Sequence, residues 1–139
     1  MDAEIFVFDS RLDGDFLRSI YEDDKEHAEM VFEKFLQSIN IQLSEIEDSY
    51  TTGDTEIFRK QIHKLKPVLS FVGLTGLTNK AGIIENNCKE VTDTASLKEL
   101  YTAFKNEITE MIPVIENDLI KLKAYPVKTF FYELKFNYC

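Results

Sequence analysis

Cysteine is scarce in this chain. The two cysteines, Cys88 and Cys139, lie far apart and do not have the spacing of a metal-binding or redox-active pair. A disulfide framework and a Cys-x-x-Cys site are therefore excluded. We expect Cys88 to be a small residue of the hydrophobic core.

Long hydrophobic runs and a basic leader are missing as well. No stretch of about 18 or more apolar residues occurs, and Asp2 and Glu4 stand where a signal peptide would carry Lys or Arg. We therefore expect a cytoplasmic protein without a membrane-spanning segment.

Positive charge is in the minority. The chain has 16 Lys and Arg against 25 Asp and Glu, which gives a net charge of −9 and a pI near 4.7. Nucleic acids and anionic membrane surfaces are bound through basic faces, so neither is expected as a main partner. With 139 residues, 44% of them hydrophobic, the chain fits one domain with a substantial core.

Acidic residues, in turn, are missing from residues 57–84. The overall composition would place about five acids in a segment of this length. The segment instead carries one histidine, His63, together with Arg59, Lys60, Lys64, Lys66 and Lys80. A locally positive face around a histidine, in an acidic protein, is the feature that a functional interpretation has to explain.

Apolar residues recur at helical spacing over most of the chain. A short helix is predicted over residues 13–21, and Asp23 followed by Glu26 has the spacing of a capping box that starts a long helix. Gly53 is predicted to end the long helix and Asp54 to cap the next one. The expected core positions of the long helix are Ala28, Phe32, Phe35, Ile39, Leu43, Ile46 and Tyr50.

Three further helices are predicted, over residues 54–72, 74–91 and 96–123. Gly73 separates the first two, and Pro113 is expected to kink the last one. The expected core positions are Phe58, Ile62, Leu65, Leu69, Val72, Leu77, Ala81, Ile84, Cys88, Val91, Leu97, Tyr101, Phe104, Ile108, Met111, Ile115, Leu119 and Leu122.

These segments predict an all-α fold. Residues 11–124 are expected to form an up-down-up-down four-helix bundle with a short N-terminal capping helix, preceded by an extended arm over residues 1–10. In the aromatic C-terminal tail, residues 125–139, the alternation after Pro126 has the period of a strand, which predicts an irregular or β-like segment. The tail either pairs with the arm, inserts into a neighbouring molecule or is an added sequence.

His63 is predicted to point away from the core, because it lies about 140° from the centre of the apolar stripe on a helical wheel. An ordinary histidine, with a pKa of about 6.5, is mostly unprotonated at neutral pH and can accept a phosphoryl group on a ring nitrogen. The added phosphate requires a cation within reach and no carboxylate nearby. Lys66 and Arg59 lie on the same face, and Ser70 is placed to donate a hydrogen bond.

An exposed histidine among Lys and Arg is also typical of an ordinary solvated helix face, and composition alone leaves both interpretations open. The missing acids and the His-x-x-Lys spacing favour a site. The other histidine, His27, sits beside Glu26 and Glu29 and is expected to be a plain surface residue. A carboxylate-bridged metal site is disfavoured, because Lys60 and Asp24 occupy the positions three before the two histidines.

Two stretches resemble a known family. The sequence His63-Lys64-Leu65-Lys66 followed by Phe71-Val72-Gly73-Leu74 resembles the active helix and following turn of histidine-containing phosphotransfer (HPt) domains, whose pattern is His-x-Leu-Lys-Gly with a downstream Leu-Gly turn. Residues 16–24 and 32–36 are similar to the family's opening helices, so the resemblance covers roughly residues 13–123. It implies a four-helix bundle that relays a phosphoryl group between receiver-domain aspartates, with His63 as phosphoacceptor and Lys66 neutralising the phosphate.

The sequence departs from the family pattern at two positions. Pro67 stands where the family usually has Gly, and it should bend the helix beside His63 because it removes a backbone hydrogen bond. Glu85 occupies the nearest match to the place where the family often has an amide side chain near the histidine. Its charge is expected to oppose a phosphate unless the side chain points elsewhere.

The sequence thus predicts a phosphorelay intermediate of bacterial two-component signal transduction. We expect Nε2 of His63 to attack an aspartyl phosphate, and the resemblance implies response-regulator receiver domains and a (hybrid) histidine kinase as partners. Because no nucleotide-binding motif occurs, we expect a monomeric carrier that is not an enzyme, without autokinase or ATPase activity and without cofactor or metal. The docking surface is expected on the second and third helices. The alternative is a non-catalytic helical interaction module whose tail, residues 125–139, mediates binding.

Overall fold

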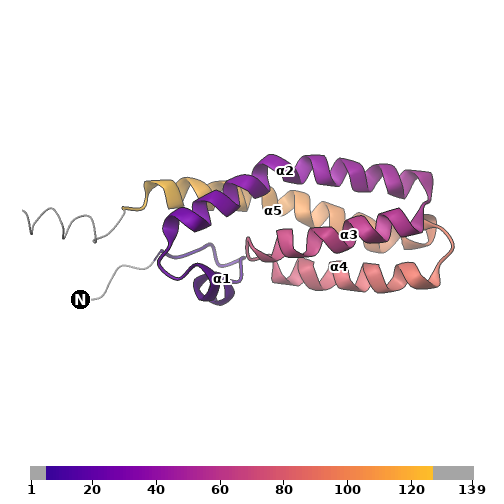
Figure 1. Cartoon of the computed structure of the whole chain (residues 1–139), viewed down its shortest axis with the longest axis horizontal. Coiled ribbons are helices and arrows are strands. Elements are labelled where there is room, and N and C mark those ends of the chain that lie inside the picture. Colours follow the sequence, from indigo (N-terminus) through magenta and orange to yellow (C-terminus); the bar gives the residue numbers. More distant parts are fainter. Residues whose placement is uncertain (1–5, 127–139) are drawn as a thin grey trace, which may run out of the picture.

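The computed structural model of this chain describes residues 6–126, which fold into five α-helices and two short 3-10 helices (Figure 1). The helices are α1 (Gly14–Tyr21), α2 (Lys25–Thr52), α3 (Thr55–Ser70), α4 (Thr75–Asn87), η1 (Cys88–Glu90), η2 (Thr94–Leu97) and α5 (Lys98–Ala124). No strand occurs within this part of the chain, so the all-α prediction is confirmed there. The strand-like pattern predicted after Pro126 lies outside the described residues.

The four long helices form a helical bundle. Helix α3 packs against α4 and α2, and α5 packs against α2 and α4. Figure 1 shows these helices side by side, with the short α1 beneath the end of the bundle where α2 begins. Between residues 6 and 126, no helix combines the length and the apolar character needed to cross a membrane.

The helix starts are fixed by aspartate side chains. Asp13, Asp24 and Asp54 each accept a hydrogen bond from a backbone N–H in the first turn of α1, α2 and α3, respectively. The predicted capping box at Asp23 is wrong by one residue. The backbone N–H of Asp24 donates a hydrogen bond to the carbonyl of Tyr21, the last residue of α1. Helix α2 therefore begins only at the residue after Asp24.

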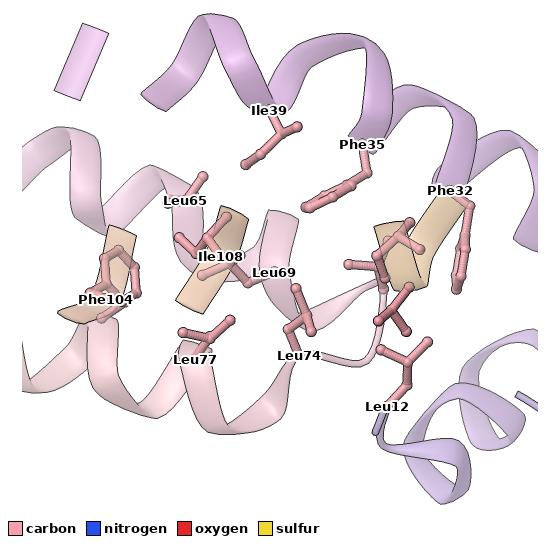
Figure 2. Close-up of a cluster of buried hydrophobic side chains, with 14 of the residues drawn as sticks. Leu12, Phe32, Phe35, Ile39, Leu65, Leu69, Leu74, Leu77, Phe104 and Ile108 are labelled. Atoms are coloured by element: carbon pink, nitrogen blue, oxygen red, sulfur yellow. The ribbon is translucent and has the colours of Figure 1, made fainter. Parts of the chain in front are cut away.

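The core is formed by the apolar stripes that the spacing predicts, and Figure 2 shows side chains from α2, α3, α4 and α5 meeting between the helices. Leu43, Tyr50, Val91 and Met111 are only partly buried against this core. The other predicted core positions are all buried: Ala28, Phe32, Phe35, Ile39, Ile46, Phe58, Ile62, Leu65, Leu69, Val72, Leu77, Ala81, Ile84, Cys88, Leu97, Tyr101, Phe104, Ile108, Ile115, Leu119 and Leu122.

The connection between α4 and α5 contains the two 3-10 helices, η1 and η2. Helix α4 ends at Asn87, and the chain continues as η1, whose Cys88 is buried as predicted. Thr94, the first residue of η2, is also buried, and its hydroxyl donates a hydrogen bond to the carbonyl of Tyr50. This hydrogen bond attaches the connection between α4 and α5 to the C-terminal end of α2.

The described part of the N-terminal arm lies against the bundle. Phe8 is buried with its ring 5.8 Å from that of Phe32. The backbone N–H of Asp9 donates to Oδ2 of Asp118 at 2.8 Å, and Asp118 has no exposed surface. Its Oδ1 has no hydrogen-bond partner among the described residues, and burial raises the pKa of this carboxyl. The sequence pattern did not mark Asp118 as a buried residue.

The turn between α3 and α4 depends on Gly73. This residue has a φ of +84°, and its carbonyl accepts a hydrogen bond from the backbone N–H of Asp13 at 2.8 Å. A Cβ built there would lie 2.7 Å from a methyl group of Leu17 and 3.0 Å from the Cβ of Leu12. Glycine is therefore needed both for the left-handed backbone and for the close approach of the α1 segment.

Replacement of Gly73 by alanine is expected to lower the free energy of unfolding by about 1–3 kcal/mol, because alanine strains the left-handed backbone. Gly82, inside α4, is the matched control, since a Cβ there meets nothing within 4 Å. Gly82→Ala should raise the free energy of unfolding by about 0.4–1 kcal/mol. Urea denaturation measures both changes, and equal shifts for the two variants would contradict this role of Gly73.

Candidate functional site

His63 lies on the outward face of α3. Its side chain is 61% exposed, whereas Ile62 and Leu65 beside it are fully buried. The predicted orientation, away from the core, is therefore confirmed. The backbone of α3 is held in place by the buried stripe, so the ring projects from a rigid element.

Glu85 of α4 reaches across to His63. Its Oε2 lies 2.6 Å from Nδ1 of the histidine, and its Oε1 accepts a hydrogen bond from Nζ of Lys66 at 2.8 Å. The expectation that no carboxylate lies near His63 is therefore wrong. The acid-free segment ends at Ile84, and the packing of α4 on α3 brings the very next residue to the histidine.

The charge of Glu85 is stabilised by its neighbours. The hydrogen bond from Lys66 is the largest influence that lowers the pKa of this carboxyl, the contact with His63 lowers it further, and burial opposes both. Glu85 is thus a carboxylate at neutral pH. Because a carboxylate only accepts hydrogen bonds, Nδ1 of His63 must donate the proton between them. In the neutral form of the ring, this arrangement places the lone pair on Nε2.

Arg59 and Lys66, the two cations predicted to serve a phosphate, are both engaged with carboxylates. Arg59 makes an ion pair with Glu56 at 2.6 Å and approaches Oε2 of Glu85 at 4.0 Å. Its hydrogen bond is the largest influence that lowers the pKa of Glu56. The structure thus brings His63, Lys66 and Arg59 around Glu85, which the resemblance placed near the histidine but which was not among the predicted site residues.

Two further predicted residues lie along the same helix but outside this cluster. Pro67 is an exposed residue inside α3, and the helix continues through it to Ser70. The bend expected at Pro67 stays a prediction. Ser70 is half-buried at the last position of α3 and is not among the side chains that Glu85 brings together.

Exposed apolar and basic side chains occur along α3 and at its C-cap. Ile57 is 48% exposed and Phe71 is 46% exposed, near the two ends of the helix. Lys60 and Lys64 are exposed between them. The face predicted for docking involved the second and third helices, and the contact with Glu85 adds α4 to the surroundings of His63.

The remaining histidine, His27, lies outside this cluster. His27 is exposed, and its ring packs edge-on against Tyr21 at 5.0 Å. In the described part of the chain, no three His, Cys, Asp or Glu side chains come together as a metal-binding group. Comparison with protein-family models, curated proteins and solved structures finds no match.

Proposed function

We propose that this chain is a phosphoryl carrier of a bacterial two-component phosphorelay. His63 accepts a phosphoryl group from the aspartate of one receiver domain and passes it to another. The observation that carries the proposal is the hydrogen bond between Nδ1 of His63 and the Glu85 carboxylate. In the neutral ring, a proton on Nδ1 leaves Nε2 unprotonated, and the ring is 61% exposed, as a phosphoryl acceptor requires.

The position of the ring proton, on Nδ1, determines how the transfer step proceeds. The lone pair of Nε2 attacks the phosphorus in line, the N–P bond forms, and the bond from phosphorus to the aspartate oxygen breaks. The aspartate leaves as a carboxylate, and no proton has to move, because the ring proton is already on Nδ1. The reverse sequence of bond changes delivers the phosphoryl group to a second receiver.

The charges around His63 fit an anionic group. Lys60 and Lys64 are exposed on α3, and Lys66 is 29% exposed beside the ring, in a chain with a net charge of −9. Cations within reach stabilise the charge that a phosphoryl group brings. In this proposal Lys66 is the principal residue that neutralises the charge of the phosphate. Arg59 assists it, because Arg59 approaches the carboxylate of Glu85.

The chain itself needs little catalytic apparatus. The resemblance to HPt domains assigns the acidic pocket and its metal ion to the receiver, so the carrier supplies a positioned imidazole and its counter-charge. We also propose that the chain is a monomeric, cytoplasmic protein, folded as an up-down-up-down bundle and without autokinase activity. A receiver or a hybrid kinase docks on the exposed face of α3, where Phe71 and Ile57 offer apolar contacts.

A two-step relay assay tests this function. A panel of receiver domains is phosphorylated with labelled phosphate, incubated with the full chain, and followed by a second, unlabelled receiver. We expect acid-labile label to appear on the chain and then on the second receiver. If no receiver in the panel transfers label to the chain, the proposed function is wrong.

A further inference from the structure

The N-terminal arm packs on the bundle through two phenylalanine rings. The Phe8 ring lies 5.8 Å from that of Phe32 in α2, and the Phe6 ring lies 5.5 Å from that of Tyr125, the residue that follows α5. A hollow of about 60 Å³ remains among Phe6, Phe8, Leu122 and Tyr125. Atoms that line such a hollow lose part of their van der Waals attraction, so these contacts hold the arm less firmly than a filled core would.

A buried carboxyl group holds the backbone of the arm. Asp118 of α5 has no exposed surface, and its Oδ2 accepts a hydrogen bond from the backbone N–H of Asp9 at 2.8 Å. Its Oδ1 has no hydrogen-bond partner within residues 6–126. An ionised carboxylate can accept hydrogen bonds on both oxygens, and a buried acceptor without a donor costs free energy. The group that holds the arm is therefore satisfied on one oxygen only.

We propose that the N-terminal arm is a releasable strap on the end of the bundle, closed most firmly when the buried carboxyl of Asp118 carries a proton and released more often when that carboxyl is ionised. Release lets water reach both oxygens and uncovers the apolar side chains of Phe32 and Leu122. The strap is independent of the proposed function, because neither Asp118 nor the arm belongs to the cluster around Glu85.

The charged groups that act on Asp118 come from the arm and from α5. Burial is the largest influence and raises the pKa of this carboxyl, and the charge of Asp9 raises it further. The hydrogen bond from the backbone of Asp9 and the charges of Lys121 and Arg11 lower it without reversing the effect of burial. Arg11 is itself committed to Asp9, because its Nε and Nη2 each donate to that carboxylate at 2.9 Å.

The direction of the pH dependence follows from these contacts. In the closed arm burial raises the pKa of Asp118, whereas in the open arm water reaches the carboxyl and its pKa returns toward the ordinary value. Closing therefore takes up a proton between these two values, and the hold on the arm weakens as the pH rises through the raised pKa. Asp9 stays ionised over this range, because its hydrogen bonds from Arg11 lower its pKa to about 2.

Amide proton exchange measures the opening of the arm. The full chain is studied by NMR from about pH 4 to about pH 8, a range that extends from the ordinary titration of a carboxyl to neutral conditions. The exchange rate of the Asp9 amide, compared with its intrinsic rate at each pH, gives the protection of this amide. The amide of Leu65, in the core of α3, reports opening of the whole fold. The ¹³C resonance of the Asp118 carboxyl reports its protonation in the same samples.

Two variants isolate the buried charge. Asp118→Asn removes it and keeps an oxygen that can accept the hydrogen bond from the backbone of Asp9. Glu116→Gln removes an exposed charge from the same helix and is the matched control. Thermal unfolding shows whether each variant is folded, and the pH profile of the parent chain decides the question without either variant.

We expect the protection of the Asp9 amide to fall by about tenfold toward neutral pH in the parent chain and in Glu116→Gln, the size expected when a buried acceptor is left without a donor. The fall should follow the titration of the Asp118 carboxyl. In Asp118→Asn the protection should vary by no more than about twofold, because asparagine does not titrate. A flat profile for the parent chain, a fall shared by the Leu65 amide, or an equal fall in Asp118→Asn would overturn the inference.

Discussion

Replacement of His63 by glutamine is expected to abolish acid-labile phosphorylation of the chain by phosphorylated receivers. Glutamine is similar in size and polarity but has no nitrogen lone pair that can attack phosphorus. The effect should be a loss to background rather than a reduced rate, because His63 is the residue that forms the covalent bond. Transfer of labelled phosphate, resolved on neutral gels, measures it.

His27→Gln is the matched control, because it replaces the other histidine of the chain by the same residue. His27 packs against Tyr21 at the start of α2, away from the cluster around Glu85. Its replacement should leave transfer unchanged. Equal labelling of His63→Gln and His27→Gln would show that the phosphoryl group goes elsewhere or nowhere.

Phe58→Ala is expected to produce the largest loss of stability among single substitutions in α3. The Phe58 ring is fully buried, 5.3 Å from the ring of Tyr101 and 5.8 Å from that of Tyr50. Truncation removes these contacts and leaves a cavity, which should lower the free energy of unfolding by about 3–5 kcal/mol. Because a domain of this kind has a total stability of about 5–15 kcal/mol, this variant should unfold at much lower urea concentration.

Phe71→Ala provides the comparison for that experiment. The Phe71 side chain is 46% exposed, and the hydrogen bond at this position, from the hydroxyl of Tyr21, goes to the backbone carbonyl. Its truncation should change the free energy of unfolding by no more than about 0.5 kcal/mol. Similar losses of stability for the two variants would contradict the assignment of Phe58 to the hydrophobic core.

Helical spacing predicted the helices and most of the core positions. Apolar residues placed at 3.6-residue periodicity have to face a common core, so Phe58, Leu65 and Ile108 could be assigned to it without coordinates. Gly53 and Asp54 carry local backbone signals and were likewise predicted correctly. The start of α2 was misplaced by one residue, because adjacent aspartates satisfy the same capping rule and only the hydrogen bond made at the end of α1 selects Asp24.

The site was predicted less completely than the fold. His63 and Lys66 share one helix, so their relation follows from sequence spacing. Glu85 belongs to another helix, and its approach depends on how α4 packs across α3, which spacing within α3 does not contain. Asp118 was missed for a similar reason, since its hydrogen-bond partner is the backbone of the N-terminal arm at Asp9.

Glu85 changes how the charges of the site are understood. The missing acids in residues 57–84 suggested a phosphate site surrounded only by cations. The carboxylate of Glu85 instead lies between Lys66 and His63 and offsets the positive charge of the unphosphorylated site. Such a balance suits the proposed function, because a carrier has to release the phosphoryl group as well as accept it, and strong net attraction would hold the phosphate too firmly.

The position of the transferred phosphate tests the central claim most directly. After incubation of the full chain with a phosphorylated receiver, ³¹P and ¹⁵N NMR together identify the atom that carries the group. We predict a single phosphoryl group on Nε2 of His63, with the proton of the ring on Nδ1. A phosphoryl group on His27, on Nδ1 of His63 or on no residue of the chain would contradict the account.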